Sequence, residues 1–287
     1  MVEVLQRRYY ASEQYLLPAD TTETARSVHH RVIVAAFANR LLLAPVELKT
    51  GNYVLESAAG TGVWALEFLE ENKKKNVILN MDCVDISDKQ FPREYPSNLH
   101  FSLHSITDLP TEWNSRFSYA HQRLLVAALN DELWRKAISE FFRVLAPGGW
   151  LELVEIEIKN AHWDVGPSSG KLTSLLPKLY GQKGCICDLG NYLPPLLRET
   201  GFVDVQCVAR DSPMDPTGES GFVGWQWGDF WKGLTRAVME AGGCGVVNSA
   251  EEYEKLVDES AMEWDDDPGK AYSTYYAILG RKPEPSS

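Results

Sequence analysis

The sequence predicts an α/β fold in which a mainly parallel sheet is covered by helices on both faces. Short apolar runs that are typical of strands alternate with longer segments whose apolar residues recur at helical spacing. Parallel strands require such crossover segments, whereas antiparallel hairpins do not. The predicted strands are, in order, residues 53–57, 77–85, 99–103, 117–123, 150–158, 202–210 and 271–279.

Length, composition and charge narrow the class of protein. With 287 residues, 44% of them hydrophobic and 24% charged, the chain matches an ordinary globular protein. A net charge of −12 argues against a nucleic-acid surface, which needs clustered Lys and Arg. The sequence contains no apolar run long enough to span a membrane and no signal-peptide pattern, so we expect a cytosolic protein without a membrane partner. The cysteine spacing predicts no metal site.

The stretch from residue 53 to residue 67 organises the rest of the chain. An apolar run ends in Glu56, a loop containing Ala58, Gly60 and Gly62 follows, and a helical pattern then begins. Small residues let the backbone approach a ligand, and the N–H groups at the start of the helix favour a negative group. Glu56 can accept hydrogen bonds from an ammonium or from hydroxyls. By itself, the loop could simply be a tight strand-to-helix connection, and it lacks the Lys-Ser/Thr of a phosphate loop.

A second acid and a leading arm complete this pattern. Asp85 ends the second strand roughly thirty residues after the first strand begins, where such units bind ribose hydroxyls. Residues 1–50 are expected to form a helical arm or lid, with a helix over about 20–43 that Pro45 stops. The remaining residues, 51–287, are expected to form one domain.

Two segments depart from the alternation and are interpreted as insertions that form a substrate cap. Residues 159–192 appear irregular in sequence, and residues 211–270 contain an aromatic stretch followed by an amphipathic helix from Ala250. Pockets for small organic molecules are largely apolar. The substrate-contact candidates are therefore aromatic, and their alternative role is the core of a helical cap: Tyr15, Trp163, Phe222, Trp225, Trp227 and Trp231.

The order of these pieces resembles a class I S-adenosylmethionine-dependent methyltransferase, over about residues 53–210 plus the last strand. The most specific portion is Arg143–Leu151, with its Pro-Gly-Gly turn before the fifth strand. The arm and loop are similar to the LaeA-like methyltransferases of fungal secondary metabolism, through the pattern Tyr15-x-x-Pro18-x-Asp20-x-x-Glu23-x-x-Arg26-x-x-His29 and Gly60–Ala65. The resemblance implies a Rossmann-like, seven-stranded, mostly parallel sheet with an antiparallel last strand, an N-terminal helical arm and helical cap insertions.

The same resemblance implies a set of residues for the cofactor S-adenosyl-L-methionine. The segment from Glu56 to Gly62 would surround its methionine half, and Asp85 would hold its ribose. Ile86 would lie against the adenine, and Ser105 with Ile106 would cover the adenine edge. The backbone at His121 would lie under the sulfonium. Ala58, Glu56 and Ser105 depart from the family, which usually has Gly, Asp and an acid there, and an Ala at position 58 is tolerated if its φ is negative.

Methyl transfer mainly needs alignment of the acceptor, with a general base if a proton must leave. His121 is the first candidate for that base, because strand ends in open α/β sheets face the ligand crevice. A structural or cofactor-packing role is its alternative. Glu155 and Glu157 on the fifth strand, and His29 or His30 on the arm, are further candidates with ordinary structural alternatives.

The sequence therefore predicts methyl transfer to a hydroxyl or amine of a small, aromatic secondary metabolite. Two alternatives remain open. One is a regulatory, non-catalytic protein of the LaeA-like type. The other is an enzyme that binds the cofactor without transferring its methyl group.

Overall fold

The computed structural model describes residues 23–214 and 224–285, with side chains from residue 29 on. Tyr15 and Phe222 lie outside the described residues. Seven strands form one sheet in the order β3-β2-β1-β4-β5-β7-β6, and β7 is the strand that runs antiparallel to its neighbours. The strands are β1 (Tyr53–Ser57), β2 (Asn80–Asp85), β3 (Leu99–Leu103), β4 (Phe117–Arg123), β5 (Leu145–Ile156), β6 (Val203–Pro213) and β7 (Tyr272–Arg281). The predicted fold class is confirmed.

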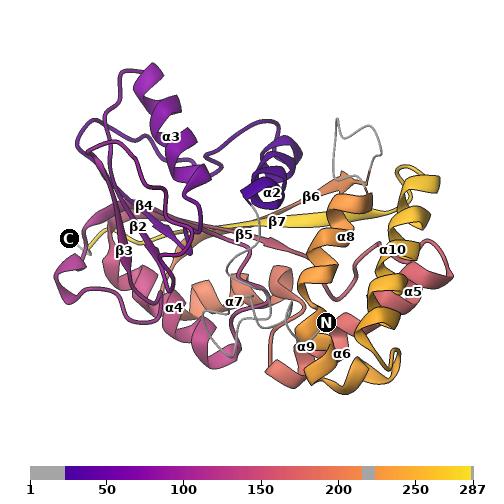
Figure 1. Ribbon diagram of the computed structural model, residues 1–287. Helices are drawn as coiled ribbons and strands as arrows, with labels where there is room; N and C mark the ends of the chain where they lie inside the picture. Colours follow the sequence, from indigo (N-terminus) through magenta and orange to yellow (C-terminus); the bar gives the residue numbers. More distant parts are fainter. Residues whose placement is uncertain (1–22, 215–223, 286–287) are drawn as a thin grey trace.

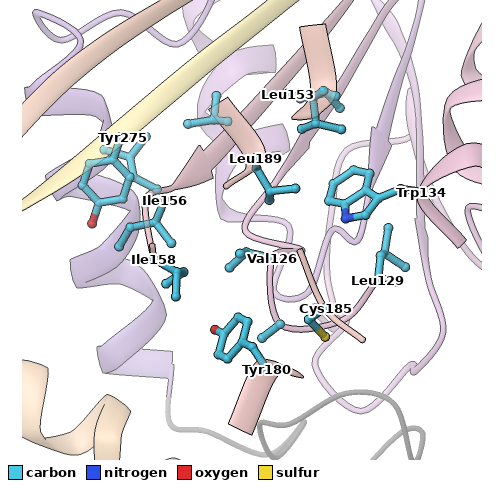
Figure 2. Close-up of a cluster of buried hydrophobic side chains, with 14 of the residues drawn as sticks. Val126, Leu129, Trp134, Leu153, Ile156, Ile158, Tyr180, Cys185, Leu189 and Tyr275 are labelled. Atoms are coloured by element: carbon cyan, nitrogen blue, oxygen red, sulfur yellow. The ribbon is translucent and has the colours of Figure 1, made fainter. Parts of the chain in front are cut away.

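Helices cover both faces of the sheet (Figure 1). On one face lie α2 (Glu23–Ala36) and α3 (Val63–Lys74), and on the other lie α4 (Asp131–Val144) and α7 (Leu189–Thr200). A core that includes Trp64 and Phe68 fills the space under α3, and a larger core that includes Trp134 fills the opposite side. Figure 2 shows the larger core, where Val126 and Leu129 from the segment after β4 meet Leu153 and Leu189.

The arm differs from its prediction in where the helix stops. Instead of continuing to about residue 43, α2 ends at Ala36, because Ala38 and Asn39 adopt left-handed φ values of 56° and 59°. The chain then runs along the molecule to β1, and Trp64 Nε1 donates a hydrogen bond to the Leu41 carbonyl (3.1 Å). Pro45 is not the stop signal.

The segment that follows β5 is helical, not irregular. It contains α5 (Pro167–Thr173) and α6 (Leu175–Lys183), and α7 begins at Leu189, inside the segment that was expected to be irregular. These helices start and stop at local signals, such as the proline at the first turn of α5 and Gly184 (φ 67°) after α6. Such signals are weak in a segment without a long apolar stripe.

The helices α5, α6, α8 (Gly224–Gly233), α9 (Thr235–Glu240) and α10 (Ala250–Asp266) gather at one end of the molecule (Figure 1). We call them the helical cap. Within it, α10 packs against both α8 and α5. The described residues also include two short 3-10 turns, Thr111–Trp113 and Gly242–Gly245. Among the described residues, no helix combines the length and the apolar character that crossing a bilayer requires.

The Pro-Gly-Gly turn is built into β5 itself. Gly148 N–H donates to the Lys282 carbonyl (2.9 Å), and Lys282 N–H donates to the Gly149 carbonyl (2.8 Å), so the end of the chain pairs with this segment. A Cβ at Gly149 would lie 2.8 Å from the Ala146 carbonyl oxygen and 2.9 Å from that of Phe117. The glycine is therefore required by close backbone packing.

Candidate functional site

The candidate site lies where the strand order reverses, between β1 and β4. In open α/β sheets, ligands bind at this point, beyond the carboxyl ends of the strands. In-register neighbours of parallel strands share a face, and one such row contains Cys83, Glu56, His121 and Glu152, on β2, β1, β4 and β5. All four side chains are buried. The sequence identified Glu56 and His121 but not the row that joins them.

The loop after β1 has the left-handed backbone that a close ligand approach requires. Ala58, Gly60 and Gly62 have φ values of 53°, 54° and 68°. A Cβ at Gly62 would lie 2.5 Å from the Phe101 ring, so this position needs glycine for space as well as for φ. Ala58 does not meet the condition of a negative φ, and it bears the strain of an L-residue in the left-handed region, about 1–2 kcal/mol.

The second predicted acid supports this loop directly. Gly60 N–H donates to Asp85 Oδ2 (2.9 Å), and Ser87 N–H donates to Asp85 Oδ1 (3.1 Å). Ile86, next in the chain, is 48% exposed. The Asp85 carboxylate therefore joins the end of β2 to the β1 loop.

The predicted adenine edge lies on the neighbouring strand end. Ser105 follows β3, which pairs with β2, and its hydroxyl lies 2.8 Å from Thr107 Oγ1. Ile106 is buried and its side chain belongs to the larger core. Ser105 therefore stabilises a local turn.

Glu56 is a buried carboxyl group whose loss of hydration is only weakly compensated by neighbouring groups. It is 3% exposed, and the Cys83 thiol lies 3.5 Å from its Oε2. Burial raises the pKa of Glu56 to about 7, against the opposing effect of the positive charge on Arg123. A cationic ligand would favour its ionised form.

The structure buries His121 instead of presenting it to the crevice. Its ring stacks on Trp64, with centroids 3.7 Å apart and planes 10° from parallel, and it is 1% exposed. Burial, together with the charge on Arg123, lowers the pKa of His121 well below its usual value. A general base must contact the proton that it removes, so this placement favours the packing role over the catalytic one.

Three hydrogen-bonded side chains link α2 and α3 to the end of β4, and of these only His30 was among the residues predicted from the sequence. Arg123 Nη2 lies 2.6 Å from His30 Nδ1, and His30 Nε2 lies 2.7 Å from Glu67 Oε2. Since a guanidinium only donates, His30 must accept at Nδ1 and donate from Nε2 as a neutral ring. Burial and the charge of Arg123 lower the pKa of His30, which is consistent with this tautomer. His30, one of the candidate bases on the arm, thus connects the arm to β4.

Glu155 and Glu157 have structural roles in the described chain. The two oxygens of Glu155 accept hydrogen bonds from the backbone N–H groups of Leu125 (2.9 Å) and Val126 (3.0 Å), which positions the segment after β4. Glu157 accepts hydrogen bonds from the Tyr276 hydroxyl (2.8 Å) and the Asn160 N–H (2.9 Å). Glu152 similarly accepts the N–H groups of Leu43 and Ala44, at 2.8 and 2.9 Å, through one oxygen.

The aromatic candidates mostly form the interior of the helical cap. Trp163, Trp227 and Trp231 are at most 1% exposed and meet edge to face, with Trp163 5.3 Å from Trp227 and 5.8 Å from Trp231. Trp225 is 59% exposed. His29 on α2 lies 5.6 Å from the Trp227 ring, so the arm reaches the cap.

A sheet of this order, with an acid-ended first strand and a left-handed loop, defines a nucleotide-cofactor fold. Residues 28–206, more than half of the chain, match the family model of a methyltransferase domain. The chain therefore belongs to this methyltransferase family.

Several fungal proteins are similar to the chain. The N-methyltransferase sirN of Leptosphaeria maculans is 34% identical over 143 residues, which cover 49% of each chain. The N-methyltransferase gliN of Aspergillus fumigatus is 30% identical over 149 residues, 51% of each chain. The secondary metabolism regulator laeA of Gibberella zeae is 26% identical over 212 residues, 69% of this chain and 65% of that protein. The chain spans about half the length of the first two relatives.

Solved structures support the fold alone. Phosphoethanolamine N-methyltransferase 2 of Haemonchus contortus, in complex with S-adenosyl-L-methionine, has a TM-score of 0.51 at 15% identity and covers 92% of this chain and 59% of its own. The YcgJ protein of Bacillus has a TM-score of 0.51 at 17% identity, over 89% of this chain and 99% of its own.

Proposed function

We propose that the chain transfers the methyl group of S-adenosyl-L-methionine to an amine of a small secondary metabolite. The proposal rests on the carboxyl end of the sheet between β1 and β4, which we call the rim. There the left-handed loop and two carboxyl groups lie together, in a chain of the methyltransferase family. The similarity to fungal N-methyltransferases supports an amine as the acceptor.

The residues present fit this cofactor. Glu56 would hold the ammonium of its methionine half, and Gly60 and Gly62 would let the protein backbone come close to the cofactor. Asp85 would accept hydrogen bonds from the ribose hydroxyls. The Asp85 carboxylate already lies against the loop, through the Gly60 N–H. When bound, the sulfonium supplies an activated methyl group, so the protein chiefly has to align the acceptor and exclude water.

The burial of His121 bears on the acceptor atom. A neutral amine attacks through its lone pair before it loses a proton, whereas a hydroxyl needs a base in contact with it. Since His121 stacks on Trp64 and is 1% exposed, an amine requires less of this site than a hydroxyl does.

The acceptor would enter between the arm and the helical cap. There, His29 and Phe230 are half-buried and their rings lie 6.0 Å apart, while Trp227 and Trp231 support them from inside the cap. Aromatic side chains with few polar groups around them suit the binding of a small aromatic metabolite.

Two measurements test the proposal. Isothermal titration with S-adenosyl-L-methionine and its demethylated product should show binding, and a lack of binding at millimolar concentrations would refute it. A panel of matched aromatic amines and phenols should then give products heavier by one CH₂, with the amines reacting first. Turnover of phenols alone would refute the choice of acceptor.

The role of His121 has its own test. His121→Phe retains a flat ring on Trp64, and we expect turnover to stay within a few-fold of the parent protein. A general base typically contributes about 10²–10⁴-fold. A loss of that size, with cofactor affinity retained, would restore His121 as the base.

A second candidate function is regulatory, without methyl transfer. It is favoured by the similarity to laeA, which spans more of this chain than sirN or gliN does, and by the strained Ala58 in the cofactor loop. Turnover of any panel compound above that of a Gly60→Trp control would count against it.

A further inference from the structure

Most of the N–H donors of the Arg123 guanidinium make no hydrogen bond among the described residues. A guanidinium carries several N–H donors in a planar fork. Within residues 23–214 and 224–285, Arg123 makes one hydrogen bond, from Nη2 to His30 Nδ1 (2.6 Å). The side chain is half-buried, so its remaining donors are shielded from bulk water without being closed off. A partly desolvated cation with unused donors favours an anionic ligand.

The strand register places this cation beside the acid of the cofactor loop. Glu56 pairs with His121, and Arg123 lies two residues further along β4. Residues two apart on a strand share a face and are separated by about 7 Å along it. Glu56 and Arg123 therefore flank the rim on the same face, and no ion pair joins them among the described side chains. Their charges nevertheless interact, since Arg123 opposes the rise in the pKa of Glu56.

An acid and a guanidinium that face one rim without meeting are complementary to an amino-acid zwitterion. The α-ammonium of such a group would lie at Glu56 and its α-carboxylate at Arg123. A phosphate fits less well, because the ionised Glu56 would repel it. A carboxylate can also accept two parallel N–H bonds from the guanidinium fork, which is the strong arrangement for this pair.

We infer that Arg123 binds the α-carboxylate of the methionine half of the cofactor, and that His30 and Glu67 position it. This inference rests on the proposed function. The arm helix thereby contributes to the cofactor site without touching the cofactor, because His30 on α2 holds the guanidinium from behind while Glu67 on α3 holds His30. The sequence-based site, drawn from the loop and strand ends, has no residue for this carboxylate.

The test compares two ligands that differ only at the amino-acid end. S-adenosylhomocysteine carries the α-ammonium and the α-carboxylate, and 5′-methylthioadenosine has the same nucleoside thioether without either group. Arg123→Met should weaken S-adenosylhomocysteine roughly ten- to hundredfold in isothermal titration, the size expected for hydrogen bonds to a charged group. Binding of methylthioadenosine should stay within about twofold, which also shows that the variant is folded.

Arg116→Met is the matched control. Arg116 lies directly before the first residue of β4, at the end of the strand opposite to Arg123, and pairs with Asp82 (2.9 Å). It should leave the affinity ratio of the two ligands unchanged. Equal weakening of both ligands by Arg123→Met, or no weakening of either, would overturn the inference. If the unaltered protein binds neither ligand, the proposed function fails as well, and the two failures are thus distinguishable.

Discussion

Replacing Ala58 with glycine should stabilise this protein, although it removes a methyl group. Ala58 has a φ of 53°, which costs an L-residue about 1–2 kcal/mol. Glycine removes that strain, but it makes the unfolded chain more flexible at a cost of about 0.4–1 kcal/mol. The difference is a gain of roughly 0.5–1 kcal/mol in the free energy of unfolding. For a chain of this size, that corresponds to a rise in Tm of about 1–3 °C.

Urea unfolding and thermal scans of the ligand-free protein measure this gain. Ala38→Gly is the matched control, because Ala38 has a φ of 56° and is exposed after α2, away from the loop. It should give a similar gain in stability and no change in the affinity for S-adenosylhomocysteine. Ala59 is buried and lacks a positive φ, so Ala59→Gly should instead destabilise the protein.

The reasoning is refuted if Ala58→Gly lowers the free energy of unfolding while Ala38→Gly raises it. That result would mean that the Ala58 methyl makes contacts worth more than the strain. The affinity for S-adenosylhomocysteine should stay equal or increase in Ala58→Gly, since glycine retains the loop conformation.

Two further predictions concern the buried carboxyl groups. Glu155→Gln should lower the free energy of unfolding by about 1–3 kcal/mol, because each Glu155 oxygen accepts a hydrogen bond from a separate backbone N–H and an amide NH₂ would face one of them. Glu152→Gln should lower it by less than about 1 kcal/mol, because one oxygen of Glu152 accepts both hydrogen bonds. Equal losses in urea unfolding would contradict this comparison. Burial raises the pKa of Glu56 and of Glu152 from 4.5 to about 7, and that of Glu155 from 4.5 to about 8. At these three groups the folded state binds more protons than the unfolded state between pH 4.5 and about 8, whereas the lowered pKa values of His30 and His121 have the opposite effect, chiefly below pH 6.5. The free energy of unfolding should therefore fall most clearly as pH rises from 6.5 to about 8. Cofactor affinity should rise from about pH 6 to 8, because the ammonium favours ionised Glu56. Stability and affinity should therefore change in opposite directions as pH rises, and a change in the same direction would contradict the role assigned to Glu56.

Much of the sheet follows from local pattern. The strands predicted at residues 53–57, 99–103 and 117–123 have those bounds in the structure, because alternation and flanking turns are short-range signals. Helix ends were harder to predict. The stop of α2 depends on left-handed φ values at Ala38 and Asn39. Asn is a residue type that tolerates this conformation, but Ala38 gives no such signal in the sequence.

The sequence by itself determined the α/β fold, the acid-ended first strand, its glycine loop and the second acid at Asp85. Only the tertiary structure decided that Ala58 is left-handed, that His121 is stacked on Trp64, and that Arg123 is held by His30 and Glu67. The physical reason is range. A turn or a strand is specified by neighbours in the chain. The protonation and orientation of a side chain depend instead on partners that can be far away in the sequence, such as His30 and Arg123, which are 93 positions apart.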